Sequence, residues 1–598
     1  MRQNVSWVIL TGLWAGSLVG LAEAALVLAT SSPPEEYGIW LFAFVSYALM
    51  GASVALLSVP WTLRRAPRRA ATLGAFLGSA PLVFVVGRYY VAQRIFGEQL
   101  PVWSASGMFA HGLLLLGALV LAGAVAWLFG RLADKGGRRA APLLLLAWLA
   151  LGGLVAAGVQ VATPRAPEIV RSATAGPERP NLILVVIDTL RADALGVYGG
   201  GPQASPRIDA LGREGVVFQH AYAQSSWTRP SIATILTGLY PSEHGAVRKL
   251  DPLPDHVDTL AEFLQRRGYW TAAFVTNINV APIFNFDQGF GEYHYLAPSF
   301  YFGATDSATR LASYKILRLL RERIWKNRIF YQHYYQDAAV VTDAVRRWLA
   351  EKPPQPFFLL VHYMDPHDPY FETPYNGHGI ARVANPSPPP ALAPEMRRLY
   401  AEDVAYLDQH FGELVEAWRK SGLLEKGWIV LTADHGEEFF EHGGWWHGTT
   451  LYEEQVRVPF VVRPPGGAAT PTIRTDVALT VDLFPTVVQA LGYTPPTQLR
   501  GVNLLAGPAP ADRVVFAEEE LEGNQLAMIR QGREKLILAN PGNPRRLPEV
   551  VLFDLEEDPL EQNNLAPQQE QRVRELRAAL EAFRIGLRKA DGRVGLGQ

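Results

Sequence analysis

Five long apolar runs in the first 162 residues constrain the fold of this chain more than any other feature. The runs cover about residues 6–30, 37–63, 71–87, 106–130 and 141–162. Most reach the ~20 residues that an α-helix needs to cross the hydrocarbon core of a bilayer, and the third is the shortest. The first run is too long for a secretory signal and lacks a clear cleavage site. The sequence therefore predicts a five-helix transmembrane domain over residues 1–162.

Charged residues between the runs predict the orientation of this domain. The second and fourth connections are basic, with Arg64, Arg65, Arg68, Arg69, Arg131, Lys135, Arg138 and Arg139, and the first carries Glu35 and Glu36. Basic connections stay on the cytoplasmic side of a membrane. We therefore expect a multi-pass protein of the inner or plasma membrane, with everything after about residue 163 on the periplasmic or extracellular side.

Composition excludes several classes of function. Hydrophobic residues make up 49% of the 598 residues and charged residues 19%, which fits a chain that lies partly in lipid. The net charge of −2 gives no argument for a nucleic-acid partner. The chain has no cysteine, which excludes disulfides, cysteine nucleophiles and thiolate metal sites. Nothing in the sequence indicates the oligomeric state.

The rest of the chain has the pattern of an α/β domain. After a polar linker at 163–180, the apolar segments Leu182–Ile187, Phe357–Val361 and Trp428–Leu431 lead to Asp188, His362 and Asp434. Buried parallel strands read as continuous apolar runs, and open α/β sheets place their sites at the carboxyl ends of the strands. Helical stretches fall between them, at 257–267 and 397–420 for example. This pattern predicts an α/β domain that starts at Asn181, with helices on both faces of its sheet.

A basic, aromatic segment at 300–335 matches no pattern of such a domain. Two interpretations stay open: a helix near the membrane surface, or a helix over the site.

Several motifs together resemble the sulfatase branch of the alkaline phosphatase superfamily. They lie at Asn181–Asp193, Arg207–Tyr222, Ser226–Gly238, Thr432–Glu437, Asp482–Tyr493 and Leu552–Ala566. The resemblance covers roughly residues 181–585. It implies an alkaline-phosphatase-like α/β/α sandwich, the sulfatase fold, with a catalytic domain at 181–500 and a small C-terminal subdomain with a tail at 501–598. It also implies an enzyme that acts on phosphate or sulfate esters.

The resemblance also implies a metal and a nucleophile. The metal ligands would be Asp188, Thr228, Asp434 and His435, which offer hard oxygen donors and one imidazole. One divalent ion, Mn²⁺, Ca²⁺, Mg²⁺ or Zn²⁺, suits such a set. Thr228 stands at the nucleophile position. The same residue could also cap a helix that starts near Pro230, and the two interpretations are compatible.

Histidines and one asparagine complete the candidate site. His367 resembles a catalytic histidine of the family, with His362 as its neighbour, although either could be a structural core histidine. His442, His447 and Asn277 are candidate substrate contacts, and Asn277 could equally be an ordinary loop residue.

A second metal site built from Asp365, His367 and His447 is an alternative, although the spacing departs from the alkaline phosphatase pattern.

Departures from the sulfatase pattern bear on the substrate. Sulfatases carry a cysteine or serine, oxidised to formylglycine, where this chain has Thr228, and an arginine where it has Ile232. Their Gly-Lys-x-His element is replaced by Thr276–Asn279. These losses predict an enzyme without formylglycine.

The leading hypothesis is a membrane-bound phospho-headgroup transferase or phosphodiesterase with a covalent threonine intermediate and a phospholipid or glycolipid substrate. Its architecture resembles that of lipoteichoic acid synthases and phosphoethanolamine transferases. Those transferases often have Glu at the position of Asp188, so a sulfuric ester hydrolase of the cell envelope that does not use formylglycine is the alternative. A non-catalytic sensor on the same fold is a further alternative.

Overall fold

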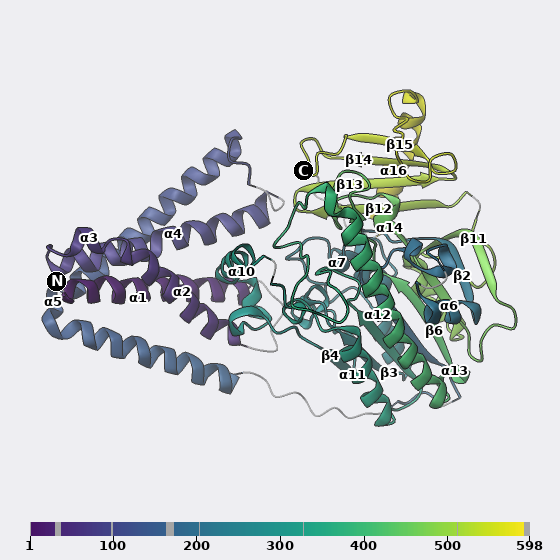
Figure 1. Cartoon of the computed structure of the whole chain (residues 1–598), viewed down its shortest axis with the longest axis horizontal. Coiled ribbons are helices and arrows are strands. Elements are labelled where there is room, and N and C mark those ends of the chain that lie inside the picture. The colour runs from purple at the N-terminus through teal and green to yellow at the C-terminus, as the bar shows by residue number, and fades with distance from the viewer. Residues whose placement is uncertain are drawn as a thin grey trace. The chain divides into compact units, whose positions relative to one another are not determined.

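The structure, a computed structural model, describes residues 2–29, 37–96, 100–162, 173–176, 178–201, 204–326, 328–510 and 512–590 (Figure 1). The described residues fall into two compact units. The first contains the N-terminal helices together with residues 300–324, and the second, here called the catalytic unit, contains the remaining described residues.

Long apolar helices make up most of the first unit: α1 (Arg2–Ala29), α2 (Gly38–Leu56), the short α3 (Val59–Thr62), α4 (Pro67–Ile95) and α5 (Ala105–Ala162). Five segments of these helices are long and apolar enough to cross a membrane, namely Gln3–Ala29, Gly38–Leu56, Pro67–Ile95, Ala105–Gly136 and Arg139–Gln160. The five predicted spans are thus confirmed as candidate spans. The third is not the shortest, because α4 continues past the apolar run at both ends.

Glycines allow α1, α2 and α4 to pack closely. A Cβ at Gly16 of α1 would lie 2.0 Å from the carbonyl oxygen of Tyr47 in α2, and one at Gly51 of α2 would lie 2.4 Å from that of Gly12. Small residues at such crossings let backbones approach, which is how helices associate in lipid.

The two halves of α5 run in opposite directions. Gly130 lies beside Thr72 and Gly87 beside Leu114, so the first half is antiparallel to α4. In the second half, the Trp14 indole donates to the Leu144 carbonyl at 3.1 Å, and the Trp148 indole donates to Ser17 Oγ at 3.0 Å. This half is therefore parallel to α1. The sequence predicts a loop between these spans, but α5 is assigned as one helix, and the two spans within it meet at Gly136 and Gly137. Glycine tolerates backbone conformations that other residues avoid, which suits a change of direction there.

A mixed sheet forms the centre of the catalytic unit. Its strands are β1 (Asn181–Ile187), β2 (Val216–Tyr222), β3 (Trp270–Val275), β4 (Glu292–Tyr295), β5 (Phe357–Tyr363), β6 (Gly427–Ala433), β9 (Arg457–Val458), β10 (Phe460–Arg463) and β11 (Thr472–Leu479). Their order is β11-β2-β10-β6-β1-β5-β3-β4, with β9 paired to β2. The four strands β6, β1, β5 and β3 are adjacent and parallel.

Helices pack against this sheet in two groups. One group holds α6 (Pro206–Arg213), α11 (Ala338–Ala350), α12 (Ala393–Lys420) and α13 (Leu423–Lys426). The other holds α7 (Thr228–Thr237), α8 (Pro241–His244), α9 (Leu260–Gln265) and α15 (Leu483–Ala490). The strand-and-helix alternation predicted from the sequence is confirmed, and the observed fold is a mixed α/β fold.

A C-terminal subdomain follows the main sheet. The antiparallel strands β12 (Val514–Leu521), β13 (Asn524–Gln531), β14 (Glu534–Ala539) and β15 (Val550–Asp554) form its sheet. Helix α16 (Glu570–Ala590) packs on that sheet through Leu576 and Leu580, which are buried with Met528 and Ile537.

Short elements fill the connections. They are α10 (Ala312–Ile324), α14 (Glu453–Val456), the hairpin of β7 (Glu438–Phe439) and β8 (Trp445–Trp446), and the 3₁₀ helices η1 (Ala192–Ala194), η2 (Gly196–Tyr198), η3 (Ile278–Val280), η4 (Pro282–Phe284), η5 (Tyr301–Gly303), η6 (Ser307–Arg310), η7 (Tyr331–His333), η8 (Pro390–Leu392) and η9 (Thr480–Asp482).

Candidate functional site

Four adjacent strand ends meet at one edge of the main sheet. Ile187 at the end of β1 is in register with Tyr363 of β5 and with Ala433 of β6. Asp188, His362 and Asp434 therefore come together, and Asn277 follows β3 on the other side of β5. All four side chains are buried. The position of the candidate site thus follows from strand register alone, as expected for the carboxyl edge of a parallel sheet.

Thr228 reaches this edge from the start of α7. It is the first helical residue, and Trp227 is the cap, so Thr228 does not cap a helix that starts at Pro230. Its hydroxyl lies 3.4 Å from Asp188 Oδ2 and 3.5 Å from His435 Nε2, and the Asn277 amide lies 3.4 Å from it. The N-terminus of a helix also favours a bound anion.

Asp188, His362 and Asp434 form a compact group of metal-ligand type, with one ligand atom of each within 4.8 Å of the others. Asp188 Oδ1 and Asp434 Oδ2 are buried and have no hydrogen-bond donor. His362 Nε2 lies 3.5 Å from Asp188 Oδ2. Two buried carboxylate oxygens without donors are costly unless a cation lies between them. These residues therefore fit a divalent ion.

His435 faces the same group through its Nε2 atom. Its Nδ1 lies 2.9 Å from the Gly436 carbonyl, which fixes the proton on Nδ1 and leaves a lone pair on Nε2. That lone pair lies 3.3 Å from Asp434 Oδ2 and 3.7 Å from Asp188 Oδ1. Such a contact between acceptors is favourable only with a cation, so His435 belongs to the candidate ligand set as well.

Backbone strain is also present here. Thr189, directly after Asp188, has φ of 54°, which is rare for a β-branched residue. Its N–H donates to Asp434 Oδ1 at 3.1 Å, and its carbonyl accepts from the Tyr400 hydroxyl at 2.9 Å. These two hydrogen bonds hold Thr189 in a conformation that directs the carboxylates of Asp188 and Asp434 toward the same point. Strained residues are common at functional sites.

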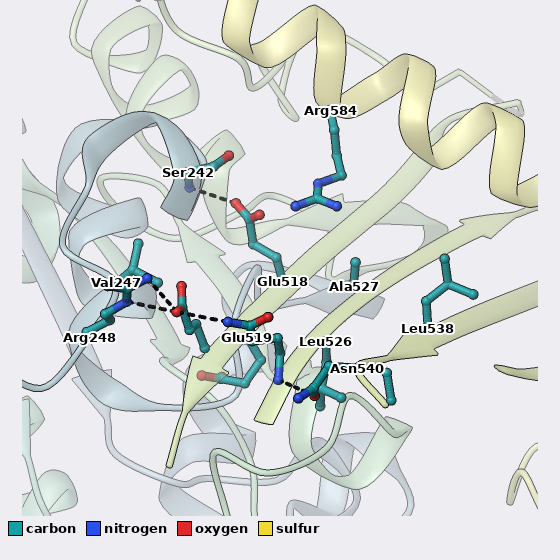
Figure 2. A pocket seen from close by; sticks show the side chains of 13 residues that line it. Ser242, Val247, Arg248, Glu518, Glu519, Leu526, Ala527, Leu538, Asn540 and Arg584 are labelled. Atoms are coloured by element: carbon teal, nitrogen blue, oxygen red, sulfur yellow. Dashed lines mark hydrogen bonds and ion pairs between the residues drawn. The ribbon is translucent and has the colours of Figure 1, made fainter. Parts of the chain in front are cut away.

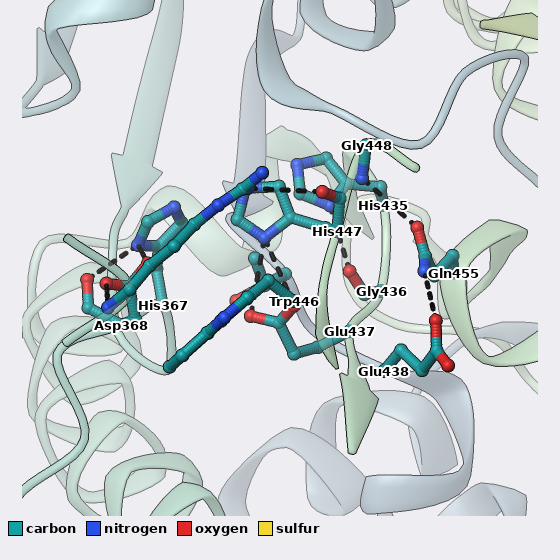
Figure 3. Close-up of polar contacts among 12 residues, drawn as sticks. His367, Asp368, His435, Gly436, Glu437, Glu438, Trp446, His447, Gly448 and Gln455 are labelled. Atoms are coloured by element: carbon teal, nitrogen blue, oxygen red, sulfur yellow. Dashed lines mark hydrogen bonds and ion pairs between the residues drawn. The ribbon is translucent and has the colours of Figure 1, made fainter. Parts of the chain in front are cut away.

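Three imidazoles, those of His367, His447 and His435, lie in a row (Figure 3). His435, at one end of the row, faces Asp188 and Asp434. The ring centroids of His435 and His447 are 4.6 Å apart, and those of His447 and His367 are 4.9 Å apart. Glu437 lies below His447, with its two oxygens 3.2 and 3.3 Å from His447 Nδ1. The Tyr370 hydroxyl donates to Glu437 at 2.6 Å. The structure thus brings together the predicted residues His367, His435 and His447.

The imidazoles differ in their affinity for a proton. Burial, together with the charge of a neighbouring histidine, lowers the pKa of His435 and of His447 to about 3. Burial also acts against a proton on His367, but Asp368, Asp188 and Glu437 raise its pKa above the usual value. His367 is therefore the imidazole in this row that carries a proton near neutral pH, as a proton donor must.

The carboxylates differ as well. Burial and the charge of Asp188 raise the pKa of Asp434 well above its usual range. Burial also acts to raise the pKa of Asp188. A hydrogen bond from His362 and the charges of three histidines outweigh burial, so that the pKa of Asp188 is lowered. Asp188 is therefore the carboxylate that keeps its negative charge, while Asp434 gains most from a bound cation.

His442, predicted as a substrate contact, lies in a different cluster. Its Nδ1 is 2.8 Å from Glu454 Oε1, its Nε2 is 3.2 Å from the Glu561 carbonyl, and its ring stacks on Tyr452 with centroids 3.7 Å apart. The structure does not bring it to the row of imidazoles, because the turn after Gly436 points it toward the C-terminal subdomain. The alternative set Asp365, His367 and His447 is not among the compact ligand groups of the described residues.

Glu519 is a functional candidate that the sequence did not indicate. Its Oε2 accepts three hydrogen bonds, from Ser225 Oγ at 2.8 Å and from the N–H and Oγ of Ser226 at 2.9 Å each. Strand β12 of the C-terminal subdomain thereby fixes the loop that carries Thr228. No local pattern reveals this contact, since it joins residues that are almost 300 positions apart.

Glu519 also lines a cavity of about 460 Å³ between the residues after α8 and the strands β12–β14 (Figure 2). Its lining includes Ser242, Arg248, Glu518, Asn540 and Arg584. None of the predicted site residues lines this cavity.

This chain matches two protein-family models and is similar to known sulfatases. The sulfatase family model matches residues 180–493, more than half of the chain, and a model described as N-sulphoglucosamine sulphohydrolase, C-terminal, matches residues 440–586. A choline-sulfatase of Rhizobium meliloti (strain 1021) is 24% identical over 486 residues, which are 69% of this chain and 90% of that protein.

Solved structures of two phosphonate monoester hydrolases share the fold. The one from Agrobacterium radiobacter has a TM-score of 0.54 at 22% identity, covering 69% of this chain and 96% of its own. The one from Silicibacter pomeroyi has a TM-score of 0.52 at 20% identity, covering 68% and 95%. All nine residues predicted for the site lie inside the matched range 180–493.

Proposed function

The chain belongs to the sulfatase family, and on this premise we propose that it is a membrane-bound enzyme that cleaves phosphate esters of lipid-linked substrates through a covalent intermediate on Thr228. As a family member it is an ester hydrolase of the alkaline phosphatase superfamily. The observation that carries the finer proposal is the buried Thr228 hydroxyl, 3.4 Å from Asp188 and 3.5 Å from His435, at the start of α7.

Sulfatase-family enzymes use a divalent metal, and Asp188, Asp434, His435 and Thr228 would hold the ion here, with His362 close enough to be a further ligand. When bound, such an ion lowers the pKa of a hydroxyl and neutralises the charge that develops on a phosphoryl group. The donor set of oxygens and imidazoles is compatible with Mn²⁺, Ca²⁺, Mg²⁺ or Zn²⁺.

The protein's own residues would perform the following steps. Asp188 Oδ2 accepts a hydrogen bond from the Thr228 hydroxyl and orients it. Thr228 Oγ bonds to phosphorus, its proton passes to water, and the bond from phosphorus to the leaving oxygen breaks. His367 gives its proton to that oxygen. A water or an acceptor hydroxyl then attacks phosphorus and loses its proton to His367. Thr228 Oγ leaves and takes a proton from water, which restores the enzyme.

The substrate and its location are part of the proposal. Five candidate spans exceed what an anchor needs, which supports a phospholipid or glycolipid substrate. The basic connections favour a cytoplasmic N-terminus and a catalytic unit on the exterior side. The cysteine-free chain makes this testable. A single cysteine in place of the exposed Glu557 should react with an impermeant maleimide on intact cells, and one in place of Arg64 only after lysis. The reverse pattern would contradict the orientation.

Mass spectrometry of Thr228 tests the mechanism. Purified protein is incubated with a divalent metal and total bacterial lipid, and its peptides are mapped beside those of Thr228→Ala and Thr228→Ser. A phospho-headgroup adduct on the wild-type peptide, absent in Thr228→Ala, is the expected result, and its mass identifies the headgroup. No adduct, together with ester hydrolysis that survives in Thr228→Ala, would contradict the nucleophile assignment.

A sulfuric ester hydrolase without formylglycine is the second candidate, since the family model and the choline-sulfatase relative are those of sulfatases. Initial rates on an aryl sulfate and on an aryl phosphodiester, with and without Thr228→Ala, separate the two. Preference for the phosphodiester supports the first proposal, and preference for the sulfate supports the second. A cysteine, the usual precursor of formylglycine, is absent from the chain.

A further inference from the structure

Residues 300–324, here called the insertion, leave the catalytic unit and pack with the apolar N-terminal helices. The chain on either side of the insertion stays in the catalytic unit. There, the Ser299 N–H donates to the Gln332 carbonyl at 2.7 Å, and the Gln336 amide donates to the Ala297 carbonyl at 2.8 Å. These bonds close the base from which the insertion emerges.

Apolar packing joins the insertion to two helices of the first unit. Tyr301, Ala308, Leu311 and Tyr314 are buried in one cluster with four residues of α1 and α2, namely Ala24, Val27, Ile39 and Ala43. The Tyr314 ring contacts that of Phe42 with centroids 6.1 Å apart. The insertion is therefore part of the core of this unit.

A buried carboxylate makes the attachment specific. Glu23 of α1 is 2% exposed and accepts from the N–H of Ala312, the first residue of α10, at 2.9 Å. Its other oxygen accepts from the Tyr47 hydroxyl. The first N–H groups of a helix lack partners within it and attract an anion. Since a carboxylate in an apolar helix is costly without a partner, α10 and Glu23 satisfy each other.

The depth of this attachment places α10 at the edge of the bilayer. Glu23 lies six residues before the end of α1, and Ser46, whose hydroxyl is 3.1 Å from that of Ser313, lies eight residues after the start of α2. With ~1.5 Å per residue these positions are about 9 and 12 Å inside the helix ends. A helix as long as α1 extends only about 6 Å beyond each side of a ~30 Å hydrocarbon core.

Helix α10 also exposes apolar and basic side chains together. Leu319, Leu320 and Ile324 are 44%, 53% and 65% exposed, and Lys315 and Arg323 are exposed as well. An amphipathic helix with apolar and basic side chains is typical of the interface between headgroups and acyl chains.

We propose that the insertion is a membrane-surface element, in which outer-leaflet lipid covers Leu319, Leu320 and Ile324 of α10 and anionic headgroups contact Lys315 and Arg323. Continuity with the candidate spans favours lipid over a protein partner, because α10 starts inside the hydrocarbon, about 3 Å from its edge at the level of Glu23. This inference rests on the proposed membrane location of the first unit. It adds a second membrane attachment, with 132 residues (168–299) between it and the N-terminal part of the first unit.

Spin labelling tests the proposal on the full chain, which has no native cysteine. Single cysteines replace Leu320, or Ile324 one turn later on the same face, and carry a nitroxide in vesicles of phosphatidylcholine and phosphatidylglycerol. Collisions with oxygen, which concentrates among acyl chains, are compared with collisions with a water-soluble nickel chelate. Labels at Leu119, exposed in an apolar span, and at Arg346, exposed on α11, give the two reference values.

The expected result is oxygen-dominated relaxation at both α10 positions, close to that at Leu119. Nickel-dominated relaxation at both positions, as at Arg346, would overturn the proposal. Poor access of both reagents would also overturn it, because protein, either a second copy or the catalytic unit, would then cover the face. Nickel access at Leu119 itself would instead refute the membrane location of the first unit, and the inference with it.

Discussion

Two buried clusters of the catalytic unit contain the same kinds of side chain and differ in one respect. Asp188, His362 and Asp434 form one, and His442, Glu454 and Glu561 form the other, each with ligand atoms within 4.8 Å of one another. Only the second cluster has a cation supplied by the protein.

That cation is the buried Lys535, 2.9 Å from both Glu453 and Glu561. Arg545 adds a second positive charge, 2.7 Å from Glu438. The comparison teaches that nearness of ligand residues does not define a metal site. A better sign is a buried carboxylate oxygen with neither a hydrogen-bond donor nor a lysine or arginine beside it, as in Asp188 and Asp434.

Activity gives the largest expected difference between the clusters. Asp188→Asn should lower turnover on a phosphodiester by about a thousandfold or more, because it removes the charge next to Thr228. His442→Gln, the matched variant in the other cluster, should change turnover by less than about threefold. Initial rates of the purified proteins measure both. An equally large loss of turnover in His442→Gln would show that the two clusters do not differ in catalysis.

Stability should separate the clusters in the opposite sense. Lys535→Met leaves buried carboxylates without their cation and should lower the free energy of unfolding by about 3–5 kcal/mol. Lys420→Met, at an exposed ion pair, should cost less than about 1 kcal/mol. Denaturant unfolding in detergent provides the measurement. Equal effects would mean that Lys535 does not neutralise the second cluster.

Removal of the metal gives a third way to compare the two clusters. In the presence of a chelator, Asp434→Asn should raise the midpoint of thermal unfolding by about 2–4 °C, because it relieves repulsion with Asp188. Glu561→Gln should lower the midpoint, because Lys535 loses a partner. Addition of a divalent ion should raise the wild-type midpoint and not that of Asp434→Asn. A rise in both would place the ion elsewhere.

The pH dependence of Glu519 gives the smallest expected effect. Burial raises its pKa from 4.5 to about 8. The folded protein thus keeps a proton that the unfolded chain loses above pH 4.5. The stabilisation is complete below that pH and lost as the pH rises toward about 8. Glu519→Gln should remove this decline in the thermal midpoint, whereas Glu557→Gln, at an exposed position, should keep it. An unchanged decline in Glu519→Gln would place the titration in another group.

Residues at strand ends could be predicted from the sequence. Asp188, His362 and Asp434 follow continuous apolar runs, and these runs are the adjacent strands β1, β5 and β6. Local hydrophobicity determines where such strands end, so it also determines which side chains reach the sheet edge. The five apolar spans were predictable for the same reason.

Contacts between separate elements could not be predicted in this way. His442 follows the Asp434–Glu437 turn closely, yet its ring lies against Tyr452 and Glu454, because the β7–β8 hairpin turns it away. Glu23 is one acidic residue in an apolar run, and only the packing of the insertion reveals its partner. Tertiary packing sets these contacts, and packing leaves no periodic signal in the sequence.

The place of β1 in the sheet has a consequence for biogenesis. Its two neighbours are β5 and β6, and Ile187 pairs with Ala433, almost 250 residues later. At a synthesis rate of ~5–20 residues per second, about 12–50 s pass before β6 follows β1 out of the ribosome. The seven-residue strand Asn181–Ile187, apolar after its first residue, has both edges unpaired until β5 emerges, and the edge toward β6 stays unpaired for the whole of this time. We therefore expect a holding chaperone to assist folding of this domain in the compartment where it folds.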